Sequence, residues 1–218
     1  MSTRLAPIAG RETFPRPSTI RTRGSKLCAR SSLLRQNKGI SAVYADMLAV
    51  RGTVLLAAKQ NAAAIKEFEN ARSTYQSLFK TGSAAYHASV AACDVKLGES
   101  STMAGQDRAA ETYFRRALDM ASPLIAGETP DVDALYAAAD AYAGLGMLSI
   151  RKAKRFPQAP QEQKQNWTDA RSWYQKSLSA WQRIGHPNHI ASNGFQAGDP
   201  AKGKRQLETV EKALAAMH

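Results

Sequence analysis

The feature that most constrains the fold is a spaced triple of residues that occurs three times along the chain. In each triple an alanine is followed four positions later by an aromatic residue, and three positions after that by a small residue. The triples are Ala64/Phe68/Ala71, Ala110/Phe114/Ala117 and Ala170/Tyr174/Ser177. Spacings of three and four place the members on one face of an α-helix. Small residues let a second helix approach closely, so each triple predicts a tightly packed helix pair.

The partner expected for the third triple is an alanine-rich stretch just upstream. Residues 133–146 read DALYAAADAYAGLG, and residues 167–184 carry the triple together with Trp167, Trp173 and Trp181. Neither stretch can bury its apolar face alone, so we predict an antiparallel pair of helices with the tryptophans in the core and at its edge. The same pairing is expected in two upstream segments, 42–79 and 84–121.

Helical periodicity continues through most of the chain, and no stretch has the alternation typical of a strand. Three boundary signals are clear: Gly98 as a helix end, a break at Ser122–Pro123, and a cap at Thr129 followed by Pro130. The predicted helices span residues 25–36, 41–59, 62–79, 84–97, 107–121, 131–146, 167–184 and 199–217. Residues 99–106 and the basic, glutamine-rich insert 151–166 are expected to be loops.

This arrangement resembles the tetratricopeptide repeat, whose second helix carries the pattern A-x3-F-x2-A. In the third pair, the core positions of the first helix and its turn glycine are matched by Leu135, Ala139, Tyr142 and Gly146. Gly52 takes the small position of the first pair, and Leu97–Gly98 supplies the turn of the second. The resemblance implies an all-α solenoid of about three helical hairpins with a C-terminal capping helix at 199–217.

The match departs from a regular array in spacing and in one core position. The triples lie 46 and 60 residues apart, whereas a regular array would repeat every ~34 residues. Asp94 stands where the first helix of the second pair should carry a large aromatic residue. An irregular helical bundle with a chance motif is therefore the alternative interpretation.

Part of the chain is similar to a more specific group of proteins. The run ADAYAGLG, a polar insert, ARSWYQKSL and a final helix opened by Asp199–Pro200 resemble the C-terminal tetratricopeptide segment of large bacterial signalling proteins. Many of those proteins carry a serine/threonine kinase domain. The resemblance covers residues 42–217, is sharpest over 133–181, and implies a docking segment, because no kinase motif occurs here.

The first 40 residues differ in composition from the rest. They contain nine Lys or Arg and one acid, a net charge of +8 out of +12 for the whole chain. With three prolines and few large apolar residues, they are expected to be a disordered basic tail. A transit peptide is an alternative, as is nonspecific binding to an anionic surface. Specific nucleic-acid recognition is not expected, since no reading helix or aromatic-rich strand follows.

Few residues suggest chemistry. His186 and His189 have a spacing that could suit a metal, but no third ligand lies nearby in the sequence. Cys28 and Cys93 are far apart and are expected to be unpaired thiols. No apolar run reaches the ~18 residues of a membrane-spanning helix. We therefore expect a non-enzymatic protein without cofactor or metal, with the cytoplasm as the favoured compartment.

The expected function is protein–protein interaction through a concave groove that holds a peptide or a partner helix. Counting repeat positions places six groove-facing candidates on the first helices of the pairs: Asp46, Thr53, Lys96, Asp133, Tyr136 and Asp140. The alternative is a regulatory or structural segment, or a companion, of a larger kinase-type signalling enzyme. The sequence identifies neither the partner nor the oligomeric state.

Overall fold

A computed structural model describes residues 38–80, 86–155, 159–185, 195 and 198–217. Within these residues there are seven α-helices and no strand, as the sequence predicts. They are α2 (Lys38–Ala57), α3 (Asn61–Lys80), α4 (His87–Met103), α5 (Asp107–Ile125), α6 (Val132–Arg155), α7 (Pro160–Ile184) and α8 (Pro200–Ala215). Contacts within the chain divide it into two units, residues 1–40 and residues 41–218. The helical body is the second unit.

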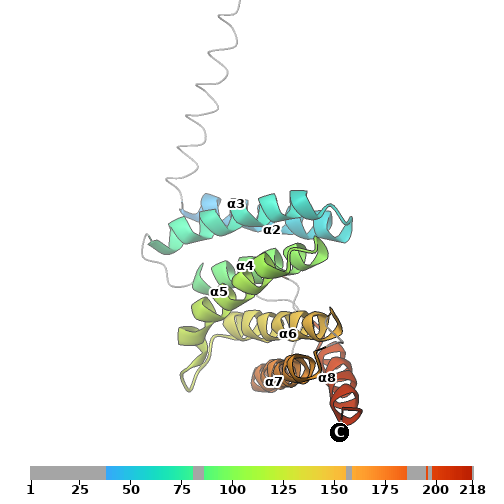
Figure 1. Ribbon diagram of the computed structural model, residues 1–218. Coiled ribbons are helices and arrows are strands. Elements are labelled where there is room, and N and C mark those ends of the chain that lie inside the picture. The colour runs from blue at the N-terminus through green and yellow to red at the C-terminus, as the bar shows by residue number, and fades with distance from the viewer. Residues whose placement is uncertain (1–37, 81–85, 156–158, 186–194, 196–197, 218) are drawn as a thin grey trace, which may run out of the picture. The chain divides into compact units, whose positions relative to one another are not determined.

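Helices that follow one another in the sequence pack against one another. Packed neighbours are α3 and α4, α4 and α5, α5 and α6, α6 and α7, and α7 and α8, with α4 also against α6. Figure 1 shows α2 with α3, α4 with α5, and α6 with α7 as successive pairs, and α8 beside the last of them. Each pair combines a helix that bears glycine with a helix that bears one of the triples.

A glycine faces an aromatic ring in every pair. A Cβ atom added at Gly52 would lie 2.8 Å from Phe68, one at Gly98 2.5 Å from Phe114, and one at Gly146 2.8 Å from Tyr174. Real Cβ atoms do not approach ring carbons this closely, so each glycine creates the space its ring occupies. All members of the three triples are buried. The prediction that the triples form closely packed helix pairs is confirmed.

Two glycines predicted at helix ends lie inside helices instead. Gly98 does not end its helix, because α4 continues to Met103, and Gly146 lies within α6, which continues to Arg155. The prediction of a loop over 99–106 is therefore wrong for most of its length. Glycine lowers helix propensity by only ~1 kcal/mol. Packing against Phe114 and Tyr174 outweighs that cost. A glycine whose sequence context predicts a helix end therefore lies within a helix, because only glycine is small enough to leave room for the ring.

Three other boundaries also differ from the prediction. Helix α5 passes through Pro123 and ends at Ile125. Proline has no N–H, so the helix loses one backbone hydrogen bond, and it loses that bond only in its final turn. The insert 151–166 is largely helical, since α7 begins at Pro160. The cap of α6 is Asp131 rather than Thr129, with the Asp131 carboxylate accepting the Ala134 N–H at 2.8 Å. Asp199 caps α8 as predicted, accepting the Ala201 N–H at 2.8 Å.

Asp94, the residue that departs from the repeat pattern, forms a buried ion pair. Its side chain is fully buried, and the Arg72 Nε of α3 lies 2.7 Å from the Asp94 Oδ1. Arg116 of α5 lies 3.6 Å from the same oxygen. The carboxylate therefore links α4 to two neighbouring helices at the position where the repeat pattern calls for an aromatic side chain.

The tryptophans of α7 lie as predicted, in the core and at its edge. Trp167 and Trp181 are buried, and Trp173 is half-buried and stacks on Tyr142 with ring centroids 5.9 Å apart. Several other predictions fall on residues outside the described ranges. They concern residues 1–37 of the basic tail, the helix at 25–36, Cys28 and the pair His186/His189. Residues 38–40, predicted as the end of the tail, are instead the first residues of α2.

Candidate functional site

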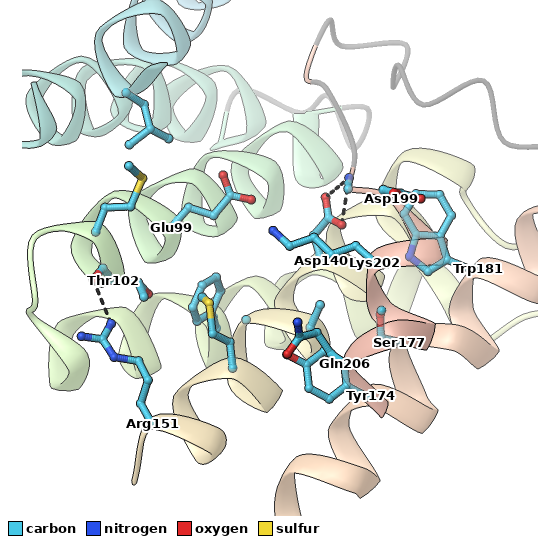
Figure 2. A pocket seen from close by; sticks show the side chains of 18 residues that line it. Glu99, Thr102, Asp140, Arg151, Tyr174, Ser177, Trp181, Asp199, Lys202 and Gln206 are labelled. Carbon is cyan, nitrogen blue, oxygen red and sulfur yellow. Dashed lines mark hydrogen bonds between the residues drawn. The ribbon is translucent and has the colours of Figure 1, made fainter. Parts of the chain in front are cut away.

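A cavity of about 560 Å³ opens between the paired helices and the start of α8. Its wall combines apolar side chains and glycine with a small set of charged groups. Figure 2 shows this lining, with the side chains of α6, α7 and α8 converging on the space. The charged groups and methionines of the lining are Glu99, Met103, Asp140, Met147, Arg151, Asp199 and Lys202. A largely apolar cavity with few polar groups is typical of a binding site.

Asp140 holds a piece of backbone from a distant part of the chain. The Gly198 N–H lies 3.0 Å from one Asp140 carboxylate oxygen and 2.9 Å from the other. Gly198 has no side chain, and a Cβ atom there would overlap the Asp140 Oδ1. Phe195, three residues earlier, is buried in the hydrophobic cluster that contains Ala45, Phe68 and Leu97. The chain before α8 is thus anchored to this side of the helices at two points.

Charged groups of alternating sign surround Asp140. The Lys96 Nζ lies 2.9 Å from the Glu99 Oε2, and Figure 2 shows Lys202 reaching across the cavity toward Asp140. Burial raises the pKa of the Asp140 carboxyl to about 7, against the opposing effect of Lys96. Burial would lower the pKa of Lys96, but Glu99 and Asp140 hold it above its usual value. Asp140 can therefore gain or lose its proton near neutral pH while contacting a backbone N–H.

The second positive group of the cavity is held in place by its neighbours. Arg151 donates to the Thr102 carbonyl oxygen at 3.0 Å and lies 3.1 Å from an Asp107 carboxylate oxygen. Both partners come from the end of α4 and the start of α5. Arg151 thus joins α6 to the preceding pair along one edge of the cavity.

The six candidates predicted from repeat positions do not form one site. Asp140 lines the cavity, and Lys96 is linked to the lining by its hydrogen bond to Glu99. Asp46 accepts a hydrogen bond from the Tyr75 hydroxyl, and Thr53 donates to its own helix at the Ala49 carbonyl oxygen, 3.0 Å away. Asp133 is half-buried at the start of α6. Tyr136 is buried, with its ring edge-on to Trp181 at 5.4 Å between centroids.

Most of the charged lining is absent from the candidates that the sequence predicts. Glu99 and Arg151 fall in the two predicted loops, because Gly98 and Gly146 have the character of helix ends. Extending the helical period past both glycines would place these side chains on α4 and α6. Lys202 and Gly198 have no comparable signal, since their place in the cavity depends on how the chain returns after α7.

The raised pKa of Asp140 predicts a pH-dependent stability. The folded state binds this proton more tightly than the unfolded chain does, so the stabilisation is complete below the unfolded pKa and is lost as pH rises through about 7. We expect the free energy of unfolding to fall between pH ~5 and ~8, and Asp140→Asn to make this fall smaller. Chemical denaturation at the two pH values measures the effect. Asp119→Asn, an exposed carboxyl on α5, is the control, and an unchanged pH dependence in Asp140→Asn would contradict the assignment.

No protein-family model matches the chain, and a search of curated proteins gives no significant match.

Proposed function

We propose that the chain is a tetratricopeptide-like protein-interaction module whose inner cavity holds an extended peptide. The proposal takes the first helices of the three pairs as the wall of a groove. Leu56 of α2, Met103 of α4 and Met147 of α6 all line the cavity, so each pair contributes at least one first-helix residue to it. Methionine adapts its shape to varied partners, which suits a surface that receives a peptide side chain.

The spacing of glycine and aromatic residue supports the repeat interpretation. Gly52 precedes Phe68 by 16 residues and Gly98 precedes Phe114 by 16 residues, and both glycines contact those rings. The third pair uses the same contact, between Gly146 and Tyr174, across a longer connection. A shared contact at a shared spacing is what stacked helical hairpins of one repeat type would produce.

One observation carries the functional proposal, the pair of hydrogen bonds between Asp140 and the Gly198 N–H. A carboxylate in a partly apolar cavity that accepts a backbone N–H can recognise a peptide regardless of its side chains. The chain's own segment supplies that N–H here. A peptide partner would use the same carboxylate, with an apolar side chain placed as Phe195 is.

A peptide with the sequence of residues 193–200, NGFQAGDP, tests the proposal directly. Gly198→Ala should weaken the internal contact, because the added Cβ atom overlaps Asp140. We expect the labelled peptide to bind this variant at least about tenfold more tightly than it binds the unmodified protein, a gain of about 1.4 kcal/mol. Fluorescence anisotropy measures the binding, and circular dichroism checks that the variant is folded.

Changing Asp140 tests whether its carboxylate recognises the peptide or whether the peptide binds only because the cavity is exposed. Combining Gly198→Ala with Asp140→Ala should abolish the gain, whereas combining it with Asp119→Ala should leave the gain intact. Asp119 is exposed on α5 and does not line the cavity. The proposed groove would be refuted if all three variants bound the peptide equally, or if none of them bound it.

A further inference from the structure

An apolar face on α2 points away from the packed helices. Its five large side chains are each more than half exposed: Val43, Tyr44, Met47, Val50 and Val54. At about 100° per residue they all lie on one side of the helix, with Met47 at the centre. The opposite side packs on α3, where Phe68 lies in the same cluster as Ala45 and Ala49. We name the five exposed residues the α2 apolar face.

The length and composition of α2 set it apart from the other described helices. It alone among them is long and apolar enough to cross a membrane, with 28% of its apolar window buried. Its contacts with α3 hold it in the helical body, since the Tyr75 hydroxyl donates to Asp46 and the Phe68 ring fills the space beside Gly52. This packing is in line with the expectation of no membrane-spanning helix. The low buried share reflects the uncovered α2 apolar face.

The corresponding positions of the later helix pairs are covered. The glycines that face an aromatic ring, Gly52, Gly98 and Gly146, align α2 with α4 at an offset of 46 residues and with α6 at an offset of 94. On α4 the positions that match the α2 apolar face are buried, or in one case half-buried: Ser89, Val90, Cys93, Lys96 and Ser100. On α6 the matching positions are all buried: Ala137, Ala138, Ala141, Gly144 and Leu148.

The preceding pair covers these positions in each case. Val90 and Cys93 belong to the cluster formed with α2 and α3, and Gly144 contacts the Phe114 ring of α5. Helix α2 belongs to the first described pair, so no described helix lies against it in this way. The α2 apolar face is thus a surface on which a further helix could pack as α3 packs on α4.

The charges beside the α2 apolar face are compensated within the chain. Asp46 is half-buried and accepts the Tyr75 hydroxyl. Arg51 has an acidic partner on α3, with its Nη1 3.4 Å from the Glu67 Oε1. Since both charges already have partners, the surface that covers this face should itself be apolar rather than charged.

The α2 apolar face matches itself when a second copy is placed against it antiparallel. A two-fold axis at the middle of the face brings Val43 level with Val54 of the second copy, and Met47 level with Val50 of that copy. Each pair occurs twice, because the two copies are equivalent. Outside α2, the exposed large apolar side chains of the described residues are scattered over α4 and α6: Met103, Val132 and Met147. A second α2 is therefore the described surface that fits the first best.

Arg51 favours the antiparallel order. Arg51 and Tyr44 lie on the same flank of the face, about 40° and 60° from Met47. In the antiparallel pair, Tyr44 of one copy comes within about 3 Å, measured along the helix axis, of Arg51 of the other. A guanidinium group stacks favourably on a tyrosine ring. Two parallel helices would instead place the two arginines side by side.

We propose that the α2 apolar face is the two-fold interface of a weak homodimer in which two α2 helices pack antiparallel. Each of the five side chains can remove roughly 100 Å² from water, or about 500 Å² on each copy. A stable interface of standard size buries about 800 Å² on each partner, so the dimer should dissociate readily on dilution. None of the five residues lines the cavity, and the inference therefore does not depend on the peptide groove.

Sedimentation equilibrium of the full chain at about 10 μM to 1 mM tests the interface. We expect a reversible equilibrium between monomer and dimer. Met47→Asp should weaken dimerisation about tenfold or more, because it places a charge in the middle of an apolar contact. Val132→Asp is the matched control and should leave dimerisation unchanged, since Val132 is 49% exposed on α6, outside this face.

Complementary charges test the antiparallel register. Val43→Glu and Val54→Lys should each weaken dimerisation about tenfold, because each places a charge opposite a valine of the other copy. The double variant should recover most of that loss, since each new carboxylate then faces the new ammonium group of the other copy. The two positions are about 16 Å apart within one helix, so the recovery cannot arise inside one copy. Parallel helices would bring like charges together and show no recovery.

Three results would overturn the proposal: a monomer at every concentration, a dimer that Met47→Asp leaves intact, and a double variant without recovery. Co-sedimentation with phosphatidylcholine vesicles identifies a different occupant. A chain that stays monomeric and binds these vesicles, with binding lost in Met47→Asp, would make the face a lipid contact and would also overturn the dimer. Circular dichroism of every variant verifies that the helices persist.

Discussion

Phe114→Ala is expected to lower the free energy of unfolding by about 3–5 kcal/mol, a range typical of a fully buried phenylalanine. The Phe114 ring is completely buried and belongs to the cluster formed by α4, α5 and α6. It also contacts glycines on two different helices, Gly98 of α4 and Gly144 of α6. Because both helices close on one ring, its removal leaves a cavity that neither helix can fill with a side chain of its own.

Denaturant unfolding monitored by circular dichroism measures the change. Phe79→Ala is the matched control, since the Phe79 ring is half-buried at the end of α3 and should cost less. A companion change, Gly144→Ala, should destabilise by about 1–3 kcal/mol, although alanine favours a helix by ~1 kcal/mol over glycine. The ring cannot move away from the new methyl group, because Gly98 confines it on the other side. A neutral Phe114→Ala, or a stabilising Gly144→Ala, would show that the ring is not confined in this way.

Arg72→Met is expected to destabilise the protein by about 3–5 kcal/mol at alkaline pH, because it leaves a buried carboxylate without its main partner. Asp94 is fully buried, and Arg72 is the nearer of its two arginines. Burial raises the pKa of Asp94 to about 7, and Arg72 opposes the rise. Without Arg72 that pKa should rise further. Below it the carboxyl takes up a proton, so the loss of stability should be smaller near pH ~5 than near pH ~8.

Two further variants make this prediction specific. Adding Asp94→Asn to Arg72→Met should recover part of the lost stability at alkaline pH, since the uncompensated charge is gone. Arg115→Met removes an exposed ion pair with Glu111 and should cost only ~0–1 kcal/mol at either pH. An Arg72→Met variant that loses the same stability at both pH values would contradict a buried, titrating Asp94.

The helix pairs could be predicted from the sequence, because the residues that indicate each helix lie only three or four positions apart. Each triple repeats at helical spacing, and a face of small residues beside one ring is stable only against another helix. The all-helical architecture, the close approach at Gly52 and the cap at Asp199 follow from such short-range patterns. Residues three or four positions apart necessarily share a helix face, so no knowledge of the distant chain was required.

The cavity and the buried ion pair could not be predicted in the same way, because their partners are far apart in the sequence. Arg72 meets Asp94 across two helices, and Asp140 meets Gly198 after an intervening helix and connection. Gly98 looks like a helix end until the Phe114 ring is placed against it. Local preferences of about 1 kcal/mol yield to packing contacts worth several. Burial and charge at these positions are therefore properties of the assembled helices.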